Sequence, residues 1–437
     1  MGLLLNAIYV AVLLLASPWL LWQGWRKGKY RQGFAEKFLG RVPVRTSNRP
    51  CVWLHAVSVG EVNLLGSLID ELHSRRPDVE IVISTTTMTG YAVAKARYAA
   101  YPIFYAPLDF SWAVNESIRR IRPNLIVLAE LELWPNLIAS AKRHGAKVAV
   151  ANGRMSDRSF RGYRRAQWLI ARVLRKLDRI ACQTETYAER FRALGANPQA
   201  VSVTGSMKFD GAETNRNNPQ TVRLKQIAGI TEDDIVCVAG STQSPEEEFA
   251  LATYQQLALA HPKLRLIIVP RHPERFEEVA QLLDCRGLAW QRRSELEQSG
   301  NGSNIRILLV DRMGELRAWW GAAAIAFVGG SFGDREGQNM IEPAAYGAAV
   351  SFGPRTKNFR DVVALLLEQQ AAKIVQSPED LTSFVRTCLE APASATELGR
   401  RAKQTVVEQV GATRRTVDLL EPMLPRLNSN ANERNAA

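Results

Sequence analysis

A glutamate that follows a predicted buried strand is the first residue in this chain with an obvious chemical use. Residues 51–56 form a continuous apolar run, a short turn follows, and Glu61 opens a helical pattern. A carboxylate at the carboxyl edge of an α/β sheet is well placed to act as a general base. The alternative is that Glu61 only complements the positive end of its helix, worth about 0.3–1 kcal/mol. We expect the helix end to keep this carboxylate ionised and to lower its basicity.

Two further acids and a lysine follow other predicted strands in the first half of the chain. Glu130 and Glu132 lie at the end of the apolar run 125–130. Because burial of a carboxylate is costly, at least one of the two should be paired with a cation or face a cleft. Lys208 follows the strand predicted for residues 201–205. It could stabilise a developing negative charge, or it could be a solvated surface lysine.

A glycine-rich loop in the second half of the chain indicates phosphate binding. A predicted strand ends at Val328, and the chain then reads GGSFGDREGQNMIEP. Glycines let backbone amides approach a phosphate, and the start of the next helix favours its charge. No GK[ST] follows, so this is not a Walker loop. Glu342 is suited to accept hydrogen bonds from ribose hydroxyls, or it is only an acid at a helix start.

The predicted strand LRLIIV is followed by Pro270 and Arg271. A guanidinium at a strand edge can hold a phosphate through two parallel hydrogen bonds. An ion pair with Glu274 or Glu277 is the alternative. A similar pattern of strand, small-residue loop and acidic helix start recurs at residues 240–248, where a functional role and helix capping are equally consistent with the sequence.

Several catalytic motifs do not occur in the sequence. There is no DxD pair at a predicted strand edge, no HExxH and no cluster of histidines, so we expect no cofactor and no obligatory divalent metal. The lack of GxSxG, and of GxGxxG at the first helix, argues against hydrolases and dehydrogenases. The five cysteines are scattered without a CxxC pair, which indicates a reducing compartment.

The first residues of the chain have the composition of a membrane anchor. Residues 3–22 carry no charge and are about long enough to cross a bilayer core. We predict an uncleaved transmembrane signal anchor over residues 1–25 and a basic juxtamembrane segment over residues 26–50. The excess of basic residues after the helix places the rest of the chain in the cytoplasm. A helix that lies in the membrane interface is the alternative.

The whole chain has a net charge of +13, and basic residues are concentrated again near its middle. In a soluble protein they would suit nucleic acid, but no nucleic-acid-binding module is recognisable. Beside a membrane anchor they suit anionic headgroups or a phosphorylated lipid acceptor better. These residues are Arg154, Arg158, Arg161, Arg164, Arg165, Arg172, Arg175, Lys176 and Arg179, interleaved with Phe160, Tyr163 and Trp168.

Short apolar runs alternate with helical patterns along the remaining chain. Continuously apolar strands are covered on both faces, as in a parallel sheet with helices on each side. We therefore predict an α/β protein with two Rossmann-like domains, residues 51–210 and 220–425, joined by a linker over residues 211–219 and facing a central cleft. GT-B glycosyltransferases and some nucleotide-sugar epimerases share this arrangement. Residues 426–437 lack apolar content and are predicted to be a flexible tail.

Nine short blocks together resemble a known enzyme family, the 3-deoxy-D-manno-octulosonic acid (Kdo) transferases of lipopolysaccharide biosynthesis, glycosyltransferase family 30. The resemblance implies an inverting GT-B enzyme anchored in the cell inner membrane. It would move Kdo from CMP-Kdo to the lipid A precursor lipid IVA on the cytoplasmic side, with release of CMP and without a metal. The blocks are WLHAVSVGE, TTTMTGY, AELELWPN, NGRMSDRS, GSMKFD, VPRHPERF, DRMGEL, FVGGSF and GQNMIEPAAYG.

The resemblance also implies roles for single residues. Glu61 matches the general base of the family, and Glu130 and Lys208 match its transition-state stabilisers. The chain departs from the common pattern at Gln338, where relatives usually have histidine, and at Ser206, where asparagine is common. The first domain would bind the acceptor and the second CMP-Kdo. The residues that match CMP-binding positions are Pro270, Arg271, Met313, Gly314, Glu315, Asn339, Met340, Ile341 and Glu342.

Two other functions are consistent with the same sequence. One is another GT-B nucleotide-sugar transferase or epimerase, which would bind UDP in preference to CMP. The other is a membrane-anchored module that binds anionic lipid without catalysis. The partners expected of a Kdo transferase are the CMP-Kdo donor, a lipid A precursor and the anionic inner-membrane surface, with no nucleic acid.

Overall fold

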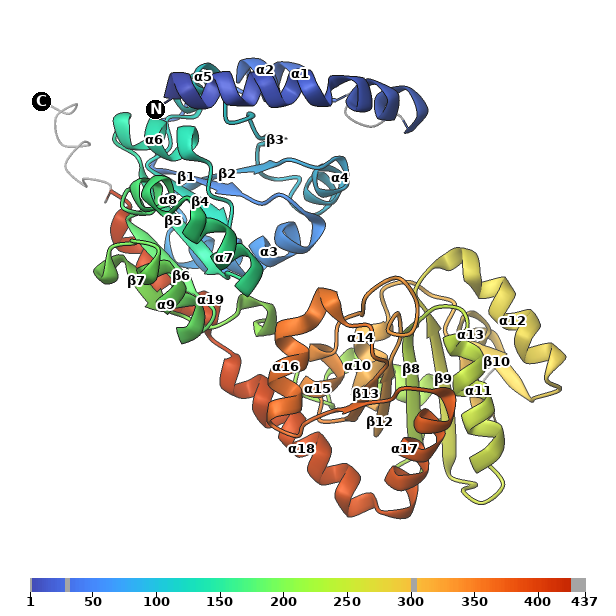
Figure 1. Ribbon diagram of the computed structural model, residues 1–437. Coiled ribbons are helices and arrows are strands. Elements are labelled where there is room, and N and C mark those ends of the chain that lie inside the picture. Colours follow the sequence, from blue (N-terminus) through green and yellow to red (C-terminus); the bar gives the residue numbers. More distant parts are fainter. Residues whose placement is uncertain (1, 28–31, 300–304, 426–437) are drawn as a thin grey trace, which may run out of the picture. The chain divides into compact units, whose positions relative to one another are not determined.

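The computed structural model of the protein folds into two compact units, each a parallel sheet between layers of helices (Figure 1). Unit 1 comprises Met1–Asp210 and Val410–Ala437, and unit 2 comprises Gly211–Gln409. The predicted tail, residues 426–437, and residues 28–31 of the predicted juxtamembrane segment lie outside the described part of the chain. The residues that the structure describes are 2–27, 32–299 and 305–425.

The sheet of unit 1 has the strand order β3-β2-β1-β4-β5-β6-β7, and all its pairings are parallel. Each strand lies where an apolar run predicts it. Because β1 lies between β2 and β4, the chain builds one half of the sheet and then crosses to the other. The carboxyl ends of β1 and β4 are therefore the place where folds of this type bind ligands. The strands are β1 (Cys51–His55), β2 (Glu80–Thr85), β3 (Ile103–Tyr105), β4 (Leu125–Ala129), β5 (Lys147–Gly153), β6 (Arg179–Cys182) and β7 (Val201–Val203).

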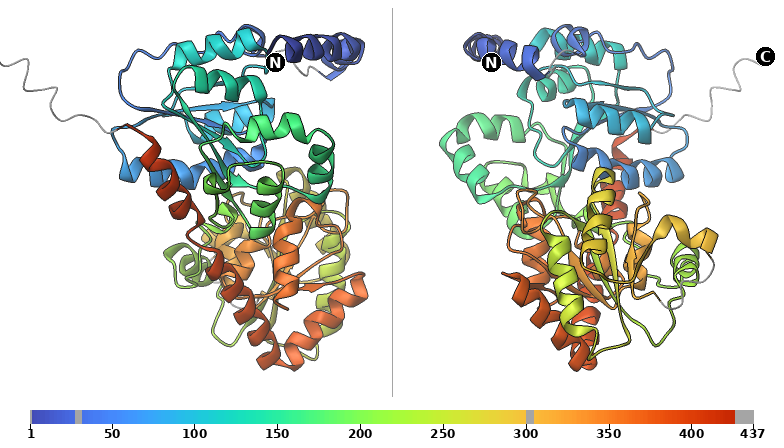
Figure 2. Two further views of the ribbon diagram at one scale, coloured as in Figure 1. Left: turned by 60° about the vertical axis from the view of Figure 1, so that its left-hand side comes forward. Right: turned by 90° about the vertical axis from the view of Figure 1, so that its right-hand side faces the viewer.

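Successive residues of each strand point to opposite faces, so the sheet of unit 1 has a hydrophobic core on each side. Trp53 is buried on one face with residues of α5, α6, α8 and α9, and Leu54 on the other with residues of α3 and α4. Figure 2 shows these helices from two further directions. The helices are α2 (Phe34–Leu39), α3 (Val59–Arg75), α4 (Met88–Arg97), α5 (Ser111–Ile121), α6 (Pro135–Arg143), α7 (Asp157–Arg165), α8 (Gln167–Leu174) and α9 (Glu185–Ala193).

Unit 2 repeats the architecture with the strand order β10-β11-β9-β8-β12-β13-β14, again all parallel. Its first strand, β8, lies between β9 and β12, as β1 does between its neighbours in unit 1. The edge strand β10 is not predicted from the sequence, because its residues are largely polar and only partly buried. The strands are β8 (Ile235–Thr242), β9 (Leu264–Pro270), β10 (Trp290–Arg292), β11 (Ile307–Leu309), β12 (Ile325–Val328), β13 (Ala349–Phe352) and β14 (Lys373–Ile374).

The last part of the chain leaves unit 2 and ends on unit 1. Helix α18 (Pro392–Gln409) packs in unit 2, whereas α19 (Ala412–Leu420) buries Val417 and Leu420 on the same face of unit 1 as α3. The sequence predicts a single second domain up to residue 425, because an amphipathic helix shows that it buries one face but not which unit receives it. The other helices of unit 2 are α10 (Pro219–Ile227), α11 (Glu246–Leu257), α12 (Phe276–Cys285), α13 (Leu296–Ser299), α14 (Leu316–Ala322), α15 (Ile341–Ala345), α16 (Arg360–Glu368) and α17 (Pro378–Glu390).

The first helix, α1 (Gly2–Lys27), is attached to unit 1 near its start and exposes apolar side chains farther along. The hydroxyl of Tyr9 donates a hydrogen bond to the carboxylate of Asp109 (3.0 Å). Leu14 and Leu15 are 68% and 84% exposed. Among the residues that the structure describes, no helix combines the length and the apolar character needed to cross a membrane.

Candidate active site

Glu61 takes part in capping its own helix. Ser58 is the N-cap of α3, and its Oγ accepts a hydrogen bond from the backbone N–H of Glu61 (3.4 Å). In return, Glu61 Oε1 accepts a hydrogen bond from the Ser58 hydroxyl (2.9 Å), and Oε2 accepts one from the backbone N–H of Val57 (2.8 Å). This is a variant of the capping box. The helix-start interpretation of Glu61 is therefore correct, and it does not exclude a chemical role.

Burial has the largest effect on the Glu61 carboxyl and raises its pKa above the ordinary value. The hydrogen bonds from Val57 and Ser58 lower the pKa, and the charge of Glu130 raises it again. The expectation that the helix start lowers the basicity of this carboxylate is thus wrong in direction, because desolvation outweighs the local hydrogen bonds. A carboxylate with a raised pKa is a stronger base than an ordinary glutamate.

Glu130 follows β4 directly and, unlike Glu132, forms ion pairs with described residues at this strand end. Its carboxylate lies 3.6 Å from Lys208 Nζ and 3.5 Å from Arg154 Nε. Its backbone has a positive φ of 56°, while its N–H still donates to the carbonyl of Ala151 (2.9 Å). A non-glycine residue in this conformation is strained by about 1–3 kcal/mol, and such residues cluster at functional sites.

Lys208 is positioned by a buried asparagine that the sequence does not single out. Lys208 lies in a short 3-10 helix, Met207–Phe209, after β7. The first N–H of this helix, that of Met207, donates to the side-chain oxygen of Asn152 (3.0 Å) at the end of β5. Asn152 is 1% exposed and has a positive φ of 57°. An asparagine at the end of an apolar run was the available sequence signal, but only the fold shows that it is buried and which backbone group it holds.

Glu132, the second acid at the end of β4, has the most strongly perturbed carboxyl of this group. Burial, and then the charges of Glu61 and Glu130, raise its pKa to about 7. At neutral pH the Glu132 carboxyl is therefore protonated in a large fraction of the molecules. The three acids and the cations Arg154 and Lys208 follow β1, β4, β5 and β7 at the carboxyl edge of the sheet, a setting suited to proton abstraction beside a developing charge.

The glycine-rich loop of unit 2 is already occupied by a carboxylate of the protein. The backbone N–H groups of Gly330 (2.7 Å), Ser331 (2.8 Å) and Phe332 (3.0 Å) all donate to the side chain of Glu246. The prediction that these amides cradle a phosphate is therefore wrong, because their hydrogen bonds are already used. Glu246, in the acidic helix start at residues 240–248, thus accepts hydrogen bonds from a loop far away in the sequence. The local sequence could not show this contact.

Pro270 and Arg271 lie at the carboxyl end of β9, as predicted. The backbone N–H of Arg271 donates to the carbonyl of Thr242 (3.0 Å), and its side chain is exposed. The ion pairs at this edge are made by Arg275, with Glu247 (3.1 Å) and Glu278 (3.3 Å). Within the described part of the chain, Arg271 forms an ion pair with neither Glu274 nor Glu277, and its guanidinium remains available to a ligand.

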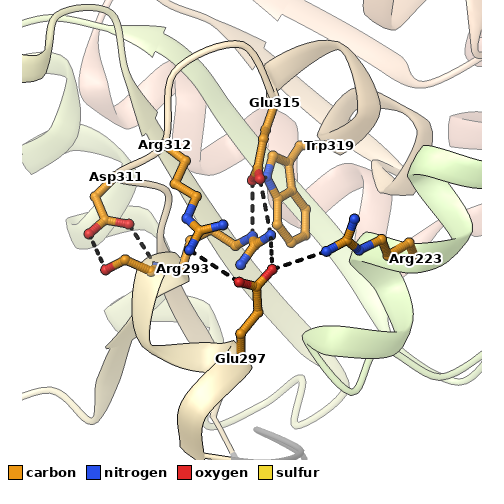
Figure 3. Close-up of polar contacts among 8 residues, drawn as sticks. Arg223, Arg293, Glu297, Asp311, Arg312, Glu315 and Trp319 are labelled. Carbon is orange, nitrogen blue, oxygen red and sulfur yellow. Dashed lines mark hydrogen bonds and ion pairs between the residues drawn. The ribbon is translucent and has the colours of Figure 1, made fainter.

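Glu315 forms a bidentate ion pair within unit 2 (Figure 3). Its two carboxylate oxygens accept hydrogen bonds from Nε and Nη2 of Arg293, both at 3.0 Å, and Trp319 Nε1 lies 3.3 Å from the same carboxylate. The Arg293 side chain is only 2% exposed. The bidentate pair fixes the turn that contains Gly314, which has a positive φ of 88°, and leaves Met313 55% exposed.

The segment from Asn339 to Glu342 offers fewer groups to a ligand than its sequence suggests. The side chains of Met340 and Ile341 are buried, so only their backbone can contact a nucleotide. Asn339 Oδ1 accepts a hydrogen bond from the N–H of Ile341 (3.1 Å). Burial raises the pKa of the Glu342 carboxyl, against the charge of Arg317 and a hydrogen bond from Asn339.

Comparison with known proteins agrees with these observations. Residues 29–211 match the family model described as 3-deoxy-D-manno-octulosonic-acid transferase (kdotransferase). A 3-deoxy-D-manno-octulosonic acid transferase of Haemophilus influenzae is 32% identical to this chain, over 96% of this chain and 98% of the relative. The chain belongs to the Kdo transferase family. A relative from Bordetella pertussis with the same description is 33% identical, over 96% and 99% of the two chains.

The fold of this Kdo transferase family member is shared more widely. A UDP-GlcNAc 2-epimerase from Neisseria meningitidis, crystallised with UDP-GlcNAc, aligns with a TM-score of 0.56 over 85% of this chain and all of the epimerase. The two sequences are only 12% identical. This likeness shows the GT-B type of fold alone, and the family membership decides between a transferase and an epimerase.

A basic surface begins directly beside the acid cluster. Helix α7 starts four residues after β5, and its capping residue Ser156 follows Arg154, the partner of Glu130, by two positions. The guanidinium of Arg172 lies 5.3 Å from the ring of Trp168, which is 64% exposed. The exposed arginines of α7 are Arg158, Arg161, Arg164 and Arg165.

Proposed function

We propose that this protein is an inverting glycosyltransferase that moves Kdo from CMP-Kdo to the lipid A precursor lipid IVA and releases CMP. The observation that carries the proposal is the cluster of Glu61, Glu130 and Lys208, which follow β1, β4 and β7 of one sheet, in a chain of the Kdo transferase family. A general base beside a fixed cation is what an inverting transfer to a hydroxyl requires.

In this proposal, Glu61 removes the proton from the acceptor hydroxyl. The freed oxygen forms a bond to the anomeric carbon of Kdo, the bond from that carbon to the CMP phosphate breaks, and CMP leaves with the electron pair. The proton ends on a Glu61 oxygen. Burial supports this role, because it raises the pKa of the carboxyl and so favours the protonated product. The hydrogen bonds from Val57 and Ser58 hold the carboxylate in one orientation.

Glu130 and Lys208 act on the charge that develops during transfer. The pair is 3.6 Å apart, and Arg154 adds a second cation at 3.5 Å from the same carboxylate. Two cations on one carboxylate leave positive charge available to the acidic Kdo and its leaving group. Asn152 keeps the lysine in place through the N–H of Met207.

Unit 2 is the donor-binding unit in this proposal. Arg271 is the candidate for the CMP phosphate, because it is exposed at a strand edge. Glu342 and Asn339 are candidates for hydrogen bonds to the nucleoside. Pro270, Met313, Gly314, Met340 and Ile341 would contribute backbone or apolar contacts, whereas Glu315 would keep the turn before α14 in place.

The test is transfer by the purified full chain. With CMP-Kdo and lipid IVA, mass spectrometry should show lipid that has gained Kdo, together with an equal amount of CMP. UDP-GlcNAc as donor should leave the lipid unchanged. A lipid fraction without Kdo, or a protein that binds UDP more tightly than CMP in calorimetry, would overturn the proposal.

We also infer that the enzyme works at the cytoplasmic side of the cell inner membrane. The exposed Leu14 and Leu15 on α1 and the basic residues after this helix support attachment to an anionic bilayer. Leu14→Glu combined with Leu15→Glu should move the protein out of the membrane fraction of cells. Unchanged membrane partitioning of this variant would contradict the role of α1.

The arginines of α7 are candidates for binding the phosphorylated acceptor. Arg161→Gln together with Arg164→Gln should raise the KM for lipid IVA and leave the KM for CMP-Kdo unchanged. Arg179→Gln is a matched control, because Arg179 starts β6 and so lies at the opposite edge of the sheet from α7. If the control variant raised the acceptor KM as much as the paired variant, the surface of α7 would have no special role.

A further inference from the structure

Glu246 connects the ends of the two central strands of unit 2. It is the first residue of α11, and only 1% of it is exposed. Its Oε2 accepts the backbone N–H groups of Gln243 (2.9 Å) and Gly330 (2.7 Å), and its Oε1 accepts those of Ser331 (2.8 Å) and Phe332 (3.0 Å). The first donor follows β8 and the other three follow β12. One carboxylate thus holds two loops that lie far apart in the sequence.

The glycine-rich loop is shaped around this carboxylate. A Cβ atom added to Gly329 would lie 2.7 Å from Glu246 Oε2 and 2.6 Å from Thr242 Cα, so no side chain fits at this position. Gly330 has a positive φ of 65°, which turns its N–H and those of the next two residues toward the same carboxylate. Consecutive amides in such a turn form a nest for an anion. Here the anion is part of the protein.

The same loop positions the segment that we propose contacts the donor. The N–H of Gly337 donates to the carbonyl of Gly330 (2.8 Å), which closes the loop. A Cβ atom on Gly330 would lie 2.9 Å from the side chain of Gln338, so the two residues are in close contact. Asn339 follows at once. A shift of Gly330 would therefore displace Gln338 and Asn339 as well.

We propose that Glu246 is a positioning residue for the donor site: as an internal anion it occupies the amide nest of residues 330–332 and thereby holds Asn339 and Glu342 where they meet the nucleotide. This inference rests on the assignment of unit 2 as the donor-binding unit. It assigns the CMP phosphate to groups outside the nest, with the exposed Arg271 as the candidate. Glu246 acts through the backbone and does not touch the substrate.

The test compares substitutions at Glu246 with a matched substitution two residues farther along the same helix. In Glu246→Gln and Glu246→Ala we expect the KM for CMP-Kdo to rise about tenfold or more, because buried N–H groups lose their acceptor and the loop relaxes. The KM for lipid IVA should change by less than about twofold. Glu248→Gln is the control, because Glu248 lies on the same helix and its side chain is 51% exposed.

Chemical rescue separates this role from a general loss of folding. Formate or acetate can return an anion to the space left in Glu246→Ala. Either should lower the donor KM and raise the melting temperature of this variant, with no effect on the Glu248→Gln protein. If Glu246→Ala does not fold, Glu246→Asp keeps the charge on a shorter side chain, and its donor KM should lie between those of the wild type and Glu246→Gln.

Three results would overturn the inference: an unchanged donor KM in Glu246→Gln, parallel changes in both KM values, or no effect of formate on Glu246→Ala. Failure of the proposed function gives a different pattern. If the wild-type protein transferred no Kdo, CMP affinity measured by calorimetry and the formate-dependent melting temperature would still test Glu246. A wild-type enzyme that transfers Kdo while the Glu246 variants bind CMP normally would reject this inference alone.

Discussion

The two units of this protein carry a glutamate at corresponding places, just after the first strand of each sheet, and surround it differently. In unit 1, Glu61 accepts one backbone N–H and one hydroxyl, and burial raises its pKa. In unit 2, Glu246 accepts four backbone N–H groups and is sealed from solvent. The first side chain keeps capacity to take a proton, whereas the second is saturated.

The difference comes from the neighbouring strand end. The residues after β4 bring two more acids toward Glu61, so charge repulsion adds to desolvation. The residues after β12 bring glycines and a row of amides toward Glu246. The same supersecondary unit thus makes a base or an internal anion, depending on whether the adjacent loop offers carboxylates or N–H groups.

The largest effect should come from Glu61→Gln, which keeps the shape of the side chain but cannot accept the acceptor proton. We expect kcat to fall by about 10²–10⁴-fold while CMP binding is unchanged. The measurement is the initial rate of Kdo transfer with saturating substrates. Glu71→Gln, on the same helix and in a surface ion pair with Arg75, is the control and should keep its rate. A loss below tenfold would remove Glu61 from the role of base.

Substitution of glutamine at Glu246 should change stability more than the same substitution at Glu61. Glu246→Gln should lower the free energy of unfolding by about 2–4 kcal/mol, because an amide cannot satisfy all the buried N–H groups. Glu61→Gln should change it by less than about 1 kcal/mol, since it loses one backbone donor near solvent. Urea unfolding of both variants gives the comparison, and equal losses would mean that the two glutamates are equivalent.

Removal of the cation beside Glu130 should have an intermediate effect. Lys208→Met keeps the length of the side chain and removes its charge, so we expect kcat to fall by about 10–10²-fold. Steady-state kinetics should show little change in either KM. Lys263→Met, in an exposed ion pair with Asp233 of unit 2, serves as the control. Should the two variants lose activity equally, the charge of Lys208 would be acting at long range and not at the site.

The smallest effect concerns pH and tests the repulsion within the acid cluster. A base must be ionised, so kcat/KM should fall as the pH drops below the pKa of Glu61. Glu130→Gln removes the like charge that adds to the pKa of Glu61 and should therefore move this acidic limb to lower pH. Because folding raises the pKa of Glu132 to about 7, its stabilising contribution is lost as the pH rises through that value. Glu132→Gln should thus gain thermal stability relative to the wild type at pH 8 and not at pH 5.

Apolar runs were sufficient to locate most of the sheet. In the described part of the chain, thirteen strands lie where an apolar run predicts them, and most of these strands are buried on both faces, so they lack the polar alternation of a surface strand. The edge strand β10 has no such signal, since edge residues remain partly in solvent. The sequence also did not show that α19 packs on unit 1, because an apolar helix face does not identify the surface that it packs against.

For the candidate site residues, too, local sequence features were predictable and contacts between distant segments were not. The sequence by itself determined that acids, a lysine and an arginine follow particular strands, because strand ends and motif residues are local features. Only the tertiary structure decided their states. It brought Glu130 to Lys208 and Arg154, burial raised the pKa of Glu61, and the amides of residues 330–332 went to Glu246. Charge, burial and hydrogen-bond satisfaction depend on segments far apart in the chain, so the same residue type became a candidate base in one unit and an internal anion in the other.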